Sequence, residues 1–400
     1  MRGLSNPDVE RPADMLLDDA ALGRALELAR RPDWPQLLPF GMDAPFFQAG
    51  LAGYSDAAMR LIARRHGAPY CITEAMLDQF LINGGRGLDA ARLRPDDHPI
   101  AGQLMGSHPA EIAQGARILV DLGYDVVDVN LACPVKKIKK RSRGGHLLRA
   151  PDEAVAILEA VRRAVPESVP VTVKLRRGSD DTAQADADFQ RVFRAVLDLG
   201  YAGATVHGRT VEQKYLGPSR WSFLRELAAS CAGRRRPGSG GFHLFGSGDV
   251  WDAVDVFRMM EQTGIDGVSV ARGCIGNPWV FEQARALMRG DVVAATTPPT
   301  VGQQRRVLLE HFGLAVEVHG EAVASRTMRK FGIRFSQHHP QGEAVRGAFI
   351  AVHSLSDWRG VLERFYGEEE RPGVRFGRAA GDVEDSCAEP AAGEASIACG

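Results

Sequence analysis

The sequence predicts an α/β fold, a (β/α)8 TIM barrel followed by a small C-terminal helical domain. Eight short apolar strands alternate with runs of helical spacing over about 245 residues, whereas a doubly wound sheet usually has fewer strands. A polar residue or a glycine stands at almost every predicted strand end, where the loops of a barrel meet. No GxGxxG motif follows the first strand, which removes the main indication of a dinucleotide-binding Rossmann unit.

The predicted elements follow in order along the chain. The strands are expected at 46–49, 70–73, 100–104, 126–130, 170–175, 202–206, 243–245 and 267–270. Runs with helical spacing lie between them at 110–122, 151–164, 183–199, 251–262 and 278–288. Because the spacing of apolar residues changes from strand-like to helical at each step, the pattern indicates repeated βα units.

The chain divides into four parts. Residues 1–41 are polar and punctuated by proline, with one amphipathic run at 20–29, so we expect an extension that lies on the barrel or stays mobile. The barrel is expected over 42–291. A linker with threonine and proline at 292–301 then leads to a helical domain at 302–366. Residues 367–400 are small, acidic and nearly free of aromatics, which is typical of a disordered tail.

Composition excludes several classes of protein. The six cysteines are scattered without a CxxC pair, which argues against a disulfide framework and against a metal site. No run of about 18 apolar residues and no signal peptide are present, so we expect a cytoplasmic protein without membrane association. We also expect a monomer.

Charge is distributed unevenly along the chain. The net charge is -1, but residues 367–400 carry -5 and residues 1–41 carry -2, which leaves +6 on residues 42–366. Six basic residues fall within 136–143, and a further basic group spans 326–334. A basic body indicates a polyanionic partner, although a solvated loop and an ordinary helix face would explain these residues equally well.

The strand ends supply groups suited to a flat heterocycle with a phosphate. Gln103, Lys174 and His207 provide an amide, an ammonium and an imidazole, which suit a flavin ring. The loops after the seventh and eighth strands often form a phosphate cradle in barrels. The candidates in these two loops are Gly246, Gly248, Asp249, Ala271, Arg272 and Gly273.

Cys133 follows the fourth strand and precedes Pro134, which ends that strand. Reduction of a carbon–carbon double bond by a flavin needs a hydride on one face and a proton from the other side. A thiol with a pKa near roughly 8.5 is mostly protonated at neutral pH and can donate that proton. Cys71 lies inside a strand and is expected in the core.

These residues fall within motifs that resemble the tRNA-dihydrouridine synthases. The matching motifs are Asn-x-x-Cys-Pro at 130–134, His-Gly-Arg-Thr at 207–210 and Arg-Gly-x-x-Gly-Asn-Pro-Trp at 272–279. The resemblance covers 46–290 strongly and the helical domain weakly. Ala132 and Ala271 stand where the family commonly has glycine.

The resemblance implies FMN-dependent reduction of specific uridines in tRNA to 5,6-dihydrouridine. Cys133 would protonate C5 of the uracil while reduced FMN delivers hydride to C6, with NADPH as the electron donor. FMN would be bound by the ring and phosphate-site residues named above. The residues expected to contact tRNA are Asn130, Lys136, Lys139, Lys140, Arg209, Arg329 and Lys330.

Two other functions remain open on the sequence alone. One is a flavin barrel that acts on a small metabolite, although a small substrate gives no reason for the basic surface. The other is a non-catalytic tRNA-binding homologue, against which the presence of Asn130, Cys133, Lys174 and His207 counts.

Overall fold

The structure is a computed structural model that describes residues 15–16, 18–134 and 143–375. Its parallel strands close into a barrel, because β2 pairs with both β1 and β4 and β1 pairs with β9. The strands are β1 (Phe46–Gln48), β2 (Cys71–Ile72), β3 (Met76–Leu77), β4 (Ile100–Met105), β5 (Val126–Leu131), β6 (Val171–Arg176), β7 (Gly203–His207), β8 (His243–Ser247) and β9 (Gly267–Val270). The eight predicted strands and the barrel are confirmed. The short strand β3 was not predicted and pairs with the end of β4.

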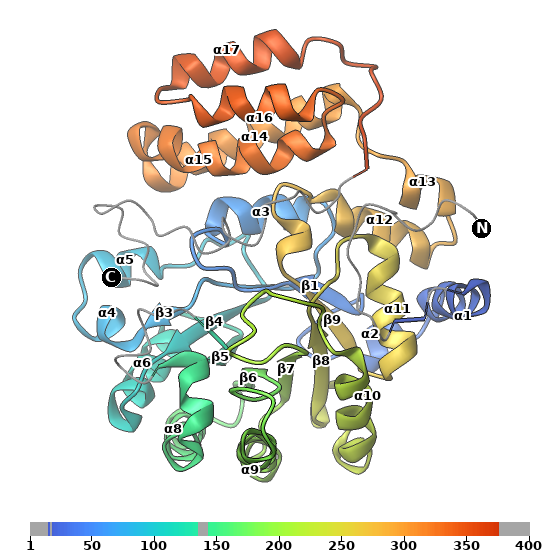
Figure 1. Ribbon diagram of the computed structural model, residues 1–400. Helices are drawn as coiled ribbons and strands as arrows, with labels where there is room; N and C mark the ends of the chain where they lie inside the picture. The colour runs from blue at the N-terminus through green and yellow to red at the C-terminus, as the bar shows by residue number, and fades with distance from the viewer. Residues whose placement is uncertain (1–14, 17, 135–142, 376–400) are drawn as a thin grey trace.

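Helices cover the outside of the barrel (Figure 1). They are α3 (Ala57–Arg65), α4 (Asp78–Ile82), α5 (Arg86–Ala90), α6 (Pro109–Asp121), α8 (Pro151–Ala164), α9 (Ala183–Asp198), α10 (Trp221–Ser230), α11 (Ala253–Thr263) and α12 (Trp279–Met288). The five helices predicted in this region are all present. Short 3-10 helices, η1 (Gly144–Arg149), η2 (Ala232–Arg234), η3 (Gly238–Gly240) and η4 (Arg272–Cys274), complete the loops.

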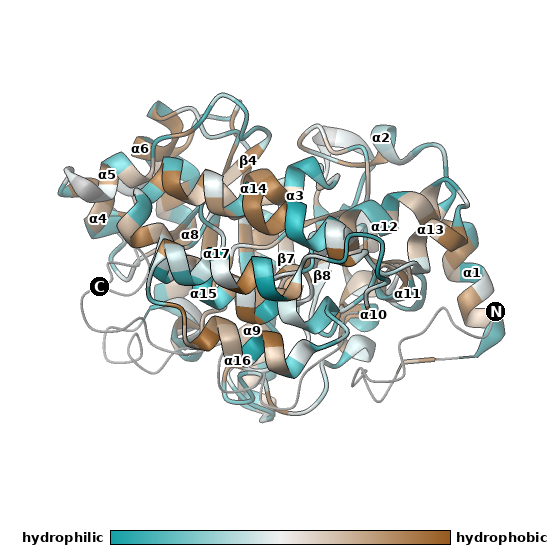
Figure 2. Cartoon of the chain, turned by 90° about the horizontal axis from the view of Figure 1, so that it is seen from above, coloured by the Kyte–Doolittle hydropathy of each residue, from teal (hydrophilic) through white to brown (hydrophobic). Residues whose placement is uncertain are grey.

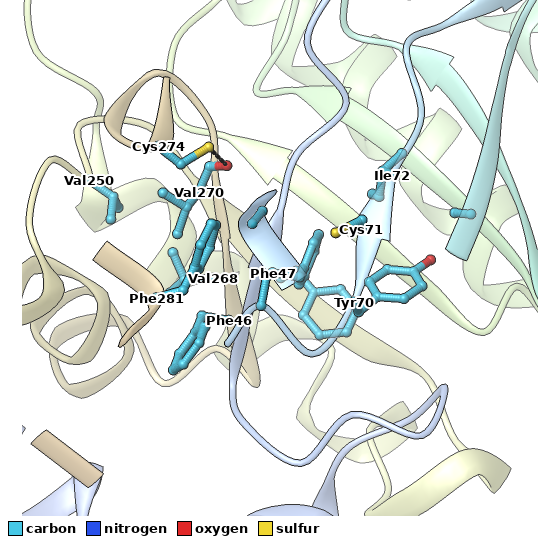
Figure 3. Packing of buried hydrophobic residues seen from close by; sticks show 14 of the residues in the cluster. Phe46, Phe47, Tyr70, Cys71, Ile72, Val250, Val268, Val270, Cys274 and Phe281 are labelled. Atoms are coloured by element: carbon cyan, nitrogen blue, oxygen red, sulfur yellow. Dashed lines mark hydrogen bonds between the residues drawn. The ribbon is translucent and has the colours of Figure 1, made fainter. Parts of the chain in front are cut away.

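The core has two layers because successive strand residues point to opposite faces of the sheet. Phe46 of β1 faces outward and stacks on Phe281 of α12, with ring centroids 6.1 Å apart. Phe47, the next residue, faces inward and meets Tyr70 at 5.4 Å and Phe245 of β8 at 5.2 Å. Figure 3 shows Phe46 and Phe47 on opposite sides of the strand. This alternation fixes which strand residues reach the barrel interior.

The described part of the N-terminal extension lies on the barrel. It contains α1 (Asp19–Ala29), which begins at the N-cap Asp18, and α2 (Trp34–Leu37). Ala21, Leu22, Ala25 and Ala29 form the buried face of α1, and α1 packs beside α11 (Figure 1). The amphipathic run therefore indicated an external layer rather than a mobile arm.

The helical domain consists of α14 (Val301–His319), α15 (Glu321–Phe335), α16 (Gly342–Ile350) and α17 (Leu355–Phe365), with the 3-10 turn η5 (Ser336–His338). Trp358 forms its centre, 5.1 Å from the ring of Phe312 and 4.8 Å from that of Phe349. Figures 1 and 2, which differ by 90°, both place these helices over the loop end of the barrel. The domain contacts α3 through α14, and it contacts the start of α12 through Phe335, whose ring lies 5.7 Å from that of Trp279.

The structure differs from the sequence prediction within two segments. The linker at 292–301 contains a short helix, α13 (Val292–Thr296), because the Asp291 carboxylate accepts the backbone N–H of Ala294 and caps it. Residues 367–375 are ordered rather than part of a disordered tail. Their backbone carbonyls at Glu369 and Arg371 accept the N–H groups at the start of α14, so they cap that helix. The rest of the predicted tail, 376–400, lies outside the described residues.

Candidate active site

A cavity opens at the carboxyl ends of the strands, beneath the helical domain. The predicted residues Gln103, Asn130, Cys133, Lys174, His207 and Arg272 all line it. They come from four strands, β4 to β7, and from the loops after β5 and β9, yet the register of the sheet brings them together. Asn130 pairs with Lys174 across β5 and β6, and Arg176 pairs with His207 across β6 and β7. The site is therefore a direct product of barrel closure.

A buried chain of hydrogen bonds holds the wall formed by β4 and β5. The Asp128 carboxylate accepts from the hydroxyl of Thr172 at 2.6 Å and from the amide of Gln103 at 2.7 Å. Gln103 Oε1 in turn accepts from Asn130 Nδ2 at 2.7 Å. Burial raises the pKa of Asp128, while these two donors and Lys174 oppose the rise. Each amide has one orientation that satisfies its partners, so the wall is preorganised.

Asn130 also fixes the backbone at Cys133. Its side-chain oxygen accepts the backbone N–H groups of Ala132 and Cys133, both at 3.0 Å. The carbonyl of Cys133 accepts the N–H of Gly145 at 3.0 Å. A side chain at Gly145 would approach that carbonyl to 3.1 Å and Val211 to 2.8 Å, so glycine permits this closure. The half-buried thiol of Cys133 is thus held at the cavity wall.

The other described cysteines are unsuited to proton donation. Cys71 and Cys231 are buried, and burial raises the pKa of each thiol to about 11. Cys274 also follows a strand, but it is buried and its thiol donates to the carbonyls of Val270 and Ala271, the first of which is drawn in Figure 3. The core position predicted for Cys71 is confirmed. Among the cysteines of the described residues, only Cys133 lines the cavity.

Lys174 and His207 add two hydrogen-bond donors to the same cavity. Burial lowers the pKa of Lys174, and the charge of Asp128 opposes that effect. Burial, together with the cations Arg176, Arg209 and Arg272, places the pKa of His207 well below its usual value. His207 is therefore neutral at pH 7. Because its Nδ1 accepts the backbone N–H of Arg209 at 3.1 Å, the ring proton is assigned to Nε2.

Arg176 was not among the predicted site residues. It is buried and its guanidinium donates to the carbonyls of Ala132 at 2.9 Å, Thr210 at 2.8 Å and Lys214 at 2.7 Å. It thereby ties the loop that carries Cys133 to the loop after β7. The two-residue spacing from Lys174 was the available signal, since both side chains must face the same side of β6.

Tyr215 and Trp251 were also missed, and both line the cavity. The guanidinium of Arg272 lies 4.9 Å from the centre of each ring, and that of Arg176 lies 5.6 Å from the ring of Tyr215. The two aromatic rings thus hold Arg272 at the loop after β9. Sequence spacing gave no indication of this contact, which joins three separate loops.

Arg209 does not reach the surface, which corrects its predicted role in contacting tRNA. Its side chain has no exposed area, and its guanidinium pairs with the Asp249 carboxylate at 2.8 Å. Asp249 also accepts the backbone N–H of Ser219 at 2.6 Å and lies 3.5 Å from Arg272. Asp249 lines the cavity, but its carboxylate is paired with Arg209 and Arg272. It therefore does not repel an anion as a free carboxylate would.

The glycines proposed for the phosphate cradle differ in position. Gly248 lines the cavity with φ at 114°, and a side chain there would approach the Ser219 hydroxyl to 2.4 Å. Gly246 faces the helix layer instead, since a side chain would meet Ile265 at 2.4 Å and Met259 at 2.7 Å. Gly246 is not among the residues that line the cavity, and close packing explains the glycine.

The residues of the loop after β9 also differ in whether they line the cavity. Ala271 lines the cavity beside Arg272. Gly273 is buried against the chain instead, and a side chain there would come within 2.2 Å of the Val250 carbonyl. It permits the close approach of two loops, so the structure gives Gly273 a packing role rather than a direct position on the cavity wall.

The predicted RNA contacts on basic residues have different outcomes. Lys136, Lys139 and Lys140 lie outside the described residues. Arg329 is exposed on α15 and is available to a partner. Lys330 is half-buried and donates to the carbonyl of Gly53 in the barrel, with its ammonium 5.0 Å from the ring centre of Tyr54. Lys330 is therefore engaged between the two domains.

Among the described residues, no group of three or more His, Cys, Asp or Glu side chains is arranged to hold a metal ion. None of the helices in the described ranges has both the length and the hydropathy needed to cross a membrane.

Comparison with known proteins identifies the family. A model of the family "Dihydrouridine synthase (Dus)" matches residues 47–364. A probable tRNA-dihydrouridine synthase of Treponema pallidum is 33% identical over 335 residues, covering 81% of this chain and 94% of that protein. The tRNA-dihydrouridine synthase B of Xanthomonas campestris is 30% identical over 313 residues, covering 78% of this chain and 89% of that protein.

Similarity to solved structures is weaker. An old yellow enzyme homologue from Zymomonas mobilis aligns with a TM-score of 0.44 and 16% sequence identity, covering 64% of this chain and 92% of that chain. This likeness adds nothing to the assignment. The family match spans both the barrel and the helical domain, and it includes the motifs around Asn130, His207 and Arg272. The chain therefore belongs to the dihydrouridine synthase family.

Proposed function

We propose that this protein reduces uridines in tRNA to 5,6-dihydrouridine with FMN as its cofactor, NADPH as the electron donor and Cys133 as the proton donor. The observation that carries the proposal is the meeting of a thiol and a set of hydrogen-bond donors in one cavity. Cys133 lines the same cavity as Lys174 and His207, although Cys133 lies in the loop after β5 and the other two lie on β6 and β7. Family membership supports the reaction class and the tRNA substrate.

The donor set of the cavity fits FMN. The neutral His207 offers Nε2–H, Lys174 offers an ammonium, and Gln103 offers an amide, which together match the carbonyl and nitrogen edge of a flavin ring. The space left by the missing side chain of Gly248, with Arg272 held nearby, suits the phosphate. When bound, the flavin would supply the hydride for C6 of the uracil.

Cys133 would complete the reduction by giving its proton to C5. Saturating the C5–C6 bond needs one hydride and one proton, so a protonated group must stand beside the base. Asn130 holds the Cys133 backbone through two N–H groups and therefore sets the direction from which the thiol approaches. Such a positioned acid is expected to contribute about 10²–10⁴-fold to the rate.

The tRNA would lie across the cavity mouth and the helical domain. Support comes from the net charge of +6 over residues 42–366 and from the exposed Arg329 on α15. Lys136, Lys139 and Lys140 directly follow the cysteine loop in the sequence. A phosphate backbone contacted by these cations would make binding strongly dependent on salt.

Reconstitution with FMN tests this proposal. The purified protein mixed with FMN should show a bound flavin spectrum, and NADPH should bleach it under anaerobic conditions. Addition of unmodified tRNA should then restore the oxidised spectrum and yield dihydrouridine. Failure to bind FMN would overturn the cofactor assignment. If a small enone reoxidised the flavin while tRNA did not, a metabolite reductase would be the better description.

A further inference from the structure

One wall of the cavity is built from the loop between β1 and α3 and is not held by the barrel alone. Leu51, Ala52 and Tyr54 of this loop line the cavity. Gly53, between them, has φ at 74°, and the loop turns there. We refer to residues 51–54 as the β1 wall. Because a loop without strand pairing is easily displaced, its contacts decide the shape of this side of the cavity.

Two charged side chains hold Gly53 from opposite domains. From the barrel, the Glu74 carboxylate accepts the backbone N–H of Gly53 at 2.8 Å. From the helical domain, the Lys330 ammonium donates to the carbonyl of the same residue. Both polar groups of one peptide residue are therefore engaged by ions, and such hydrogen bonds are stronger than neutral ones.

Aromatic contacts also connect the helical domain to Tyr54, which lines the cavity. The ring of Tyr54 meets Phe331 of α15 edge to face, with centroids 5.6 Å apart. The Lys330 ammonium lies 5.0 Å from the centre of the Tyr54 ring and 5.6 Å from that of Phe331. Consecutive residues of α15 thus fix consecutive residues of the β1 wall. Arg329, the preceding residue, is exposed instead.

We infer that Lys330 is a positioning residue that sets the β1 wall of the cavity from the helical domain, with Glu74 as its counterpart in the barrel. The helical domain then has a second role besides contact with a nucleic acid, because the cavity has its full shape only when this domain is docked. Lys330 neither lines the cavity nor lies on the exposed side of α15, so it acts through Gly53 and Tyr54.

Amide hydrogen exchange of the full-length protein, without tRNA, tests the inference directly. The amides of Gly53, Tyr54 and Ser55 donate to Glu74 and to the carbonyl of Leu51 in the folded loop. Lys330→Met removes the ammonium but keeps most of the apolar stem. Loss of a hydrogen bond to a charged group should speed exchange of these amides about tenfold. Lys330→Arg, which keeps a charged donor, should restore exchange to within about threefold of the native rate.

Arg329→Met is the matched control, since it removes one positive charge from the neighbouring position. It should leave exchange over 53–55 unchanged but reduce the salt dependence of tRNA binding by about one ion. Lys330→Met should speed amide exchange over 53–55 but leave the salt dependence of tRNA binding unchanged. Native exchange in Lys330→Met, or a reduction of its salt dependence equal to that of Arg329→Met, would overturn the inference.

A second variant covers the case in which Lys330→Met unfolds the helical domain. Glu74→Gln keeps an acceptor for the Gly53 N–H but removes its charge, and it should speed exchange at Gly53 several-fold while leaving β5 protected. A native exchange rate of the Gly53 amide in this variant would contradict the role of Glu74 in holding the β1 wall. The exchange measurements need neither flavin, tRNA nor turnover, so they can fail while the proposed function stands, and the reverse is also true.

Discussion

Two walls of one cavity are held in different ways. The wall that carries Gln103, Asn130 and Cys133 is fixed by a hydrogen-bond chain that begins at Asp128 and stays within the barrel. The β1 wall, residues 51–54, is held between Glu74 of the barrel and Lys330 of the helical domain. The first wall presents the thiol of Cys133, the proposed proton donor, and its hydrogen bonds do not involve the helical domain. The second depends on it, so substitutions on the two walls should have separable effects.

The largest effect is expected from Cys133→Ala. Removal of the proton donor should lower the single-turnover rate of dihydrouridine formation about 10²–10⁴-fold, with FMN content and tRNA affinity close to native. Rapid quench with nucleoside analysis measures that rate. Cys274→Ala is the control, because its buried thiol lies off the cavity wall, and turnover should persist. Native turnover by Cys133→Ala would refute the role of the thiol as acid.

Asn130→Ala should have the next largest effect. It removes the acceptor for the N–H groups of Ala132 and Cys133 and leaves the Gln103 oxygen without its donor. A displaced catalytic group should lower kcat about 10–100-fold, while Cys133 is still present. Asn277→Ala is the matched control, since that buried amide donates to the Gly273 carbonyl outside this wall. Equal losses in both variants would show that general destabilisation explains the effect.

Acid should weaken the junction between the domains. His311 is buried against Phe331, with ring centroids 4.3 Å apart, and burial lowers its pKa to about 4. The unfolded chain binds this proton near pH 6.5 and the folded chain does not, so stability falls as pH drops from 6.5 to 4. This residue should cost about 2 kcal/mol between pH 7 and pH 5.

Urea unfolding at pH 7 and pH 5 measures this loss. His311→Phe should reduce the acid loss by that amount, because neither ring nitrogen of His311 has a hydrogen-bond partner within the described residues and phenylalanine has no proton to bind. His207, whose pKa is also lowered by burial and by neighbouring cations, should continue to contribute in both proteins. The same pH dependence in variant and native protein would contradict this account of the junction.

The smallest effect is expected from Arg329→Met. Arg329 is exposed, so loss of one phosphate contact should weaken tRNA binding only a few-fold at moderate salt and lower the slope of log K against log salt by roughly one. Filter binding across a salt series measures both quantities. A slope equal to that of the native protein would remove Arg329 from the interface.

The barrel and the wall that carries Gln103, Asn130 and Cys133 could be predicted from the sequence because both depend on local patterns. Strand alternation and strand ends located Gln103, Asn130, Cys133, Lys174 and His207, and the parallel register then brought them into one cavity. The short strand β3 escaped prediction, since Met76–Leu77 gains its pairing only from β4.

The errors concern contacts between segments far apart in the sequence. The sequence predicted Arg209 to be a surface cation. Its partner Asp249 lies 40 residues later, so the sequence did not show that the two pair in the folded protein. Lys330 looked like an RNA contact, and its tie to Gly53 spans 277 residues. Gly246 belongs to a phosphate loop by sequence but faces Met259 in space. A charge or a glycine shows what a position permits, whereas its neighbours decide how it is used.

The most direct test of the central claim is to map dihydrouridine in tRNA from cells that lack this protein. The account predicts that one or more positions lose dihydrouridine, that the native gene restores them and that the Cys133→Ala variant does not. The strongest contradiction would come from cells that already lack their other dihydrouridine synthases. If further deletion of this gene left their dihydrouridine unchanged at every position, the account would be wrong. Full restoration by the alanine variant would also contradict it.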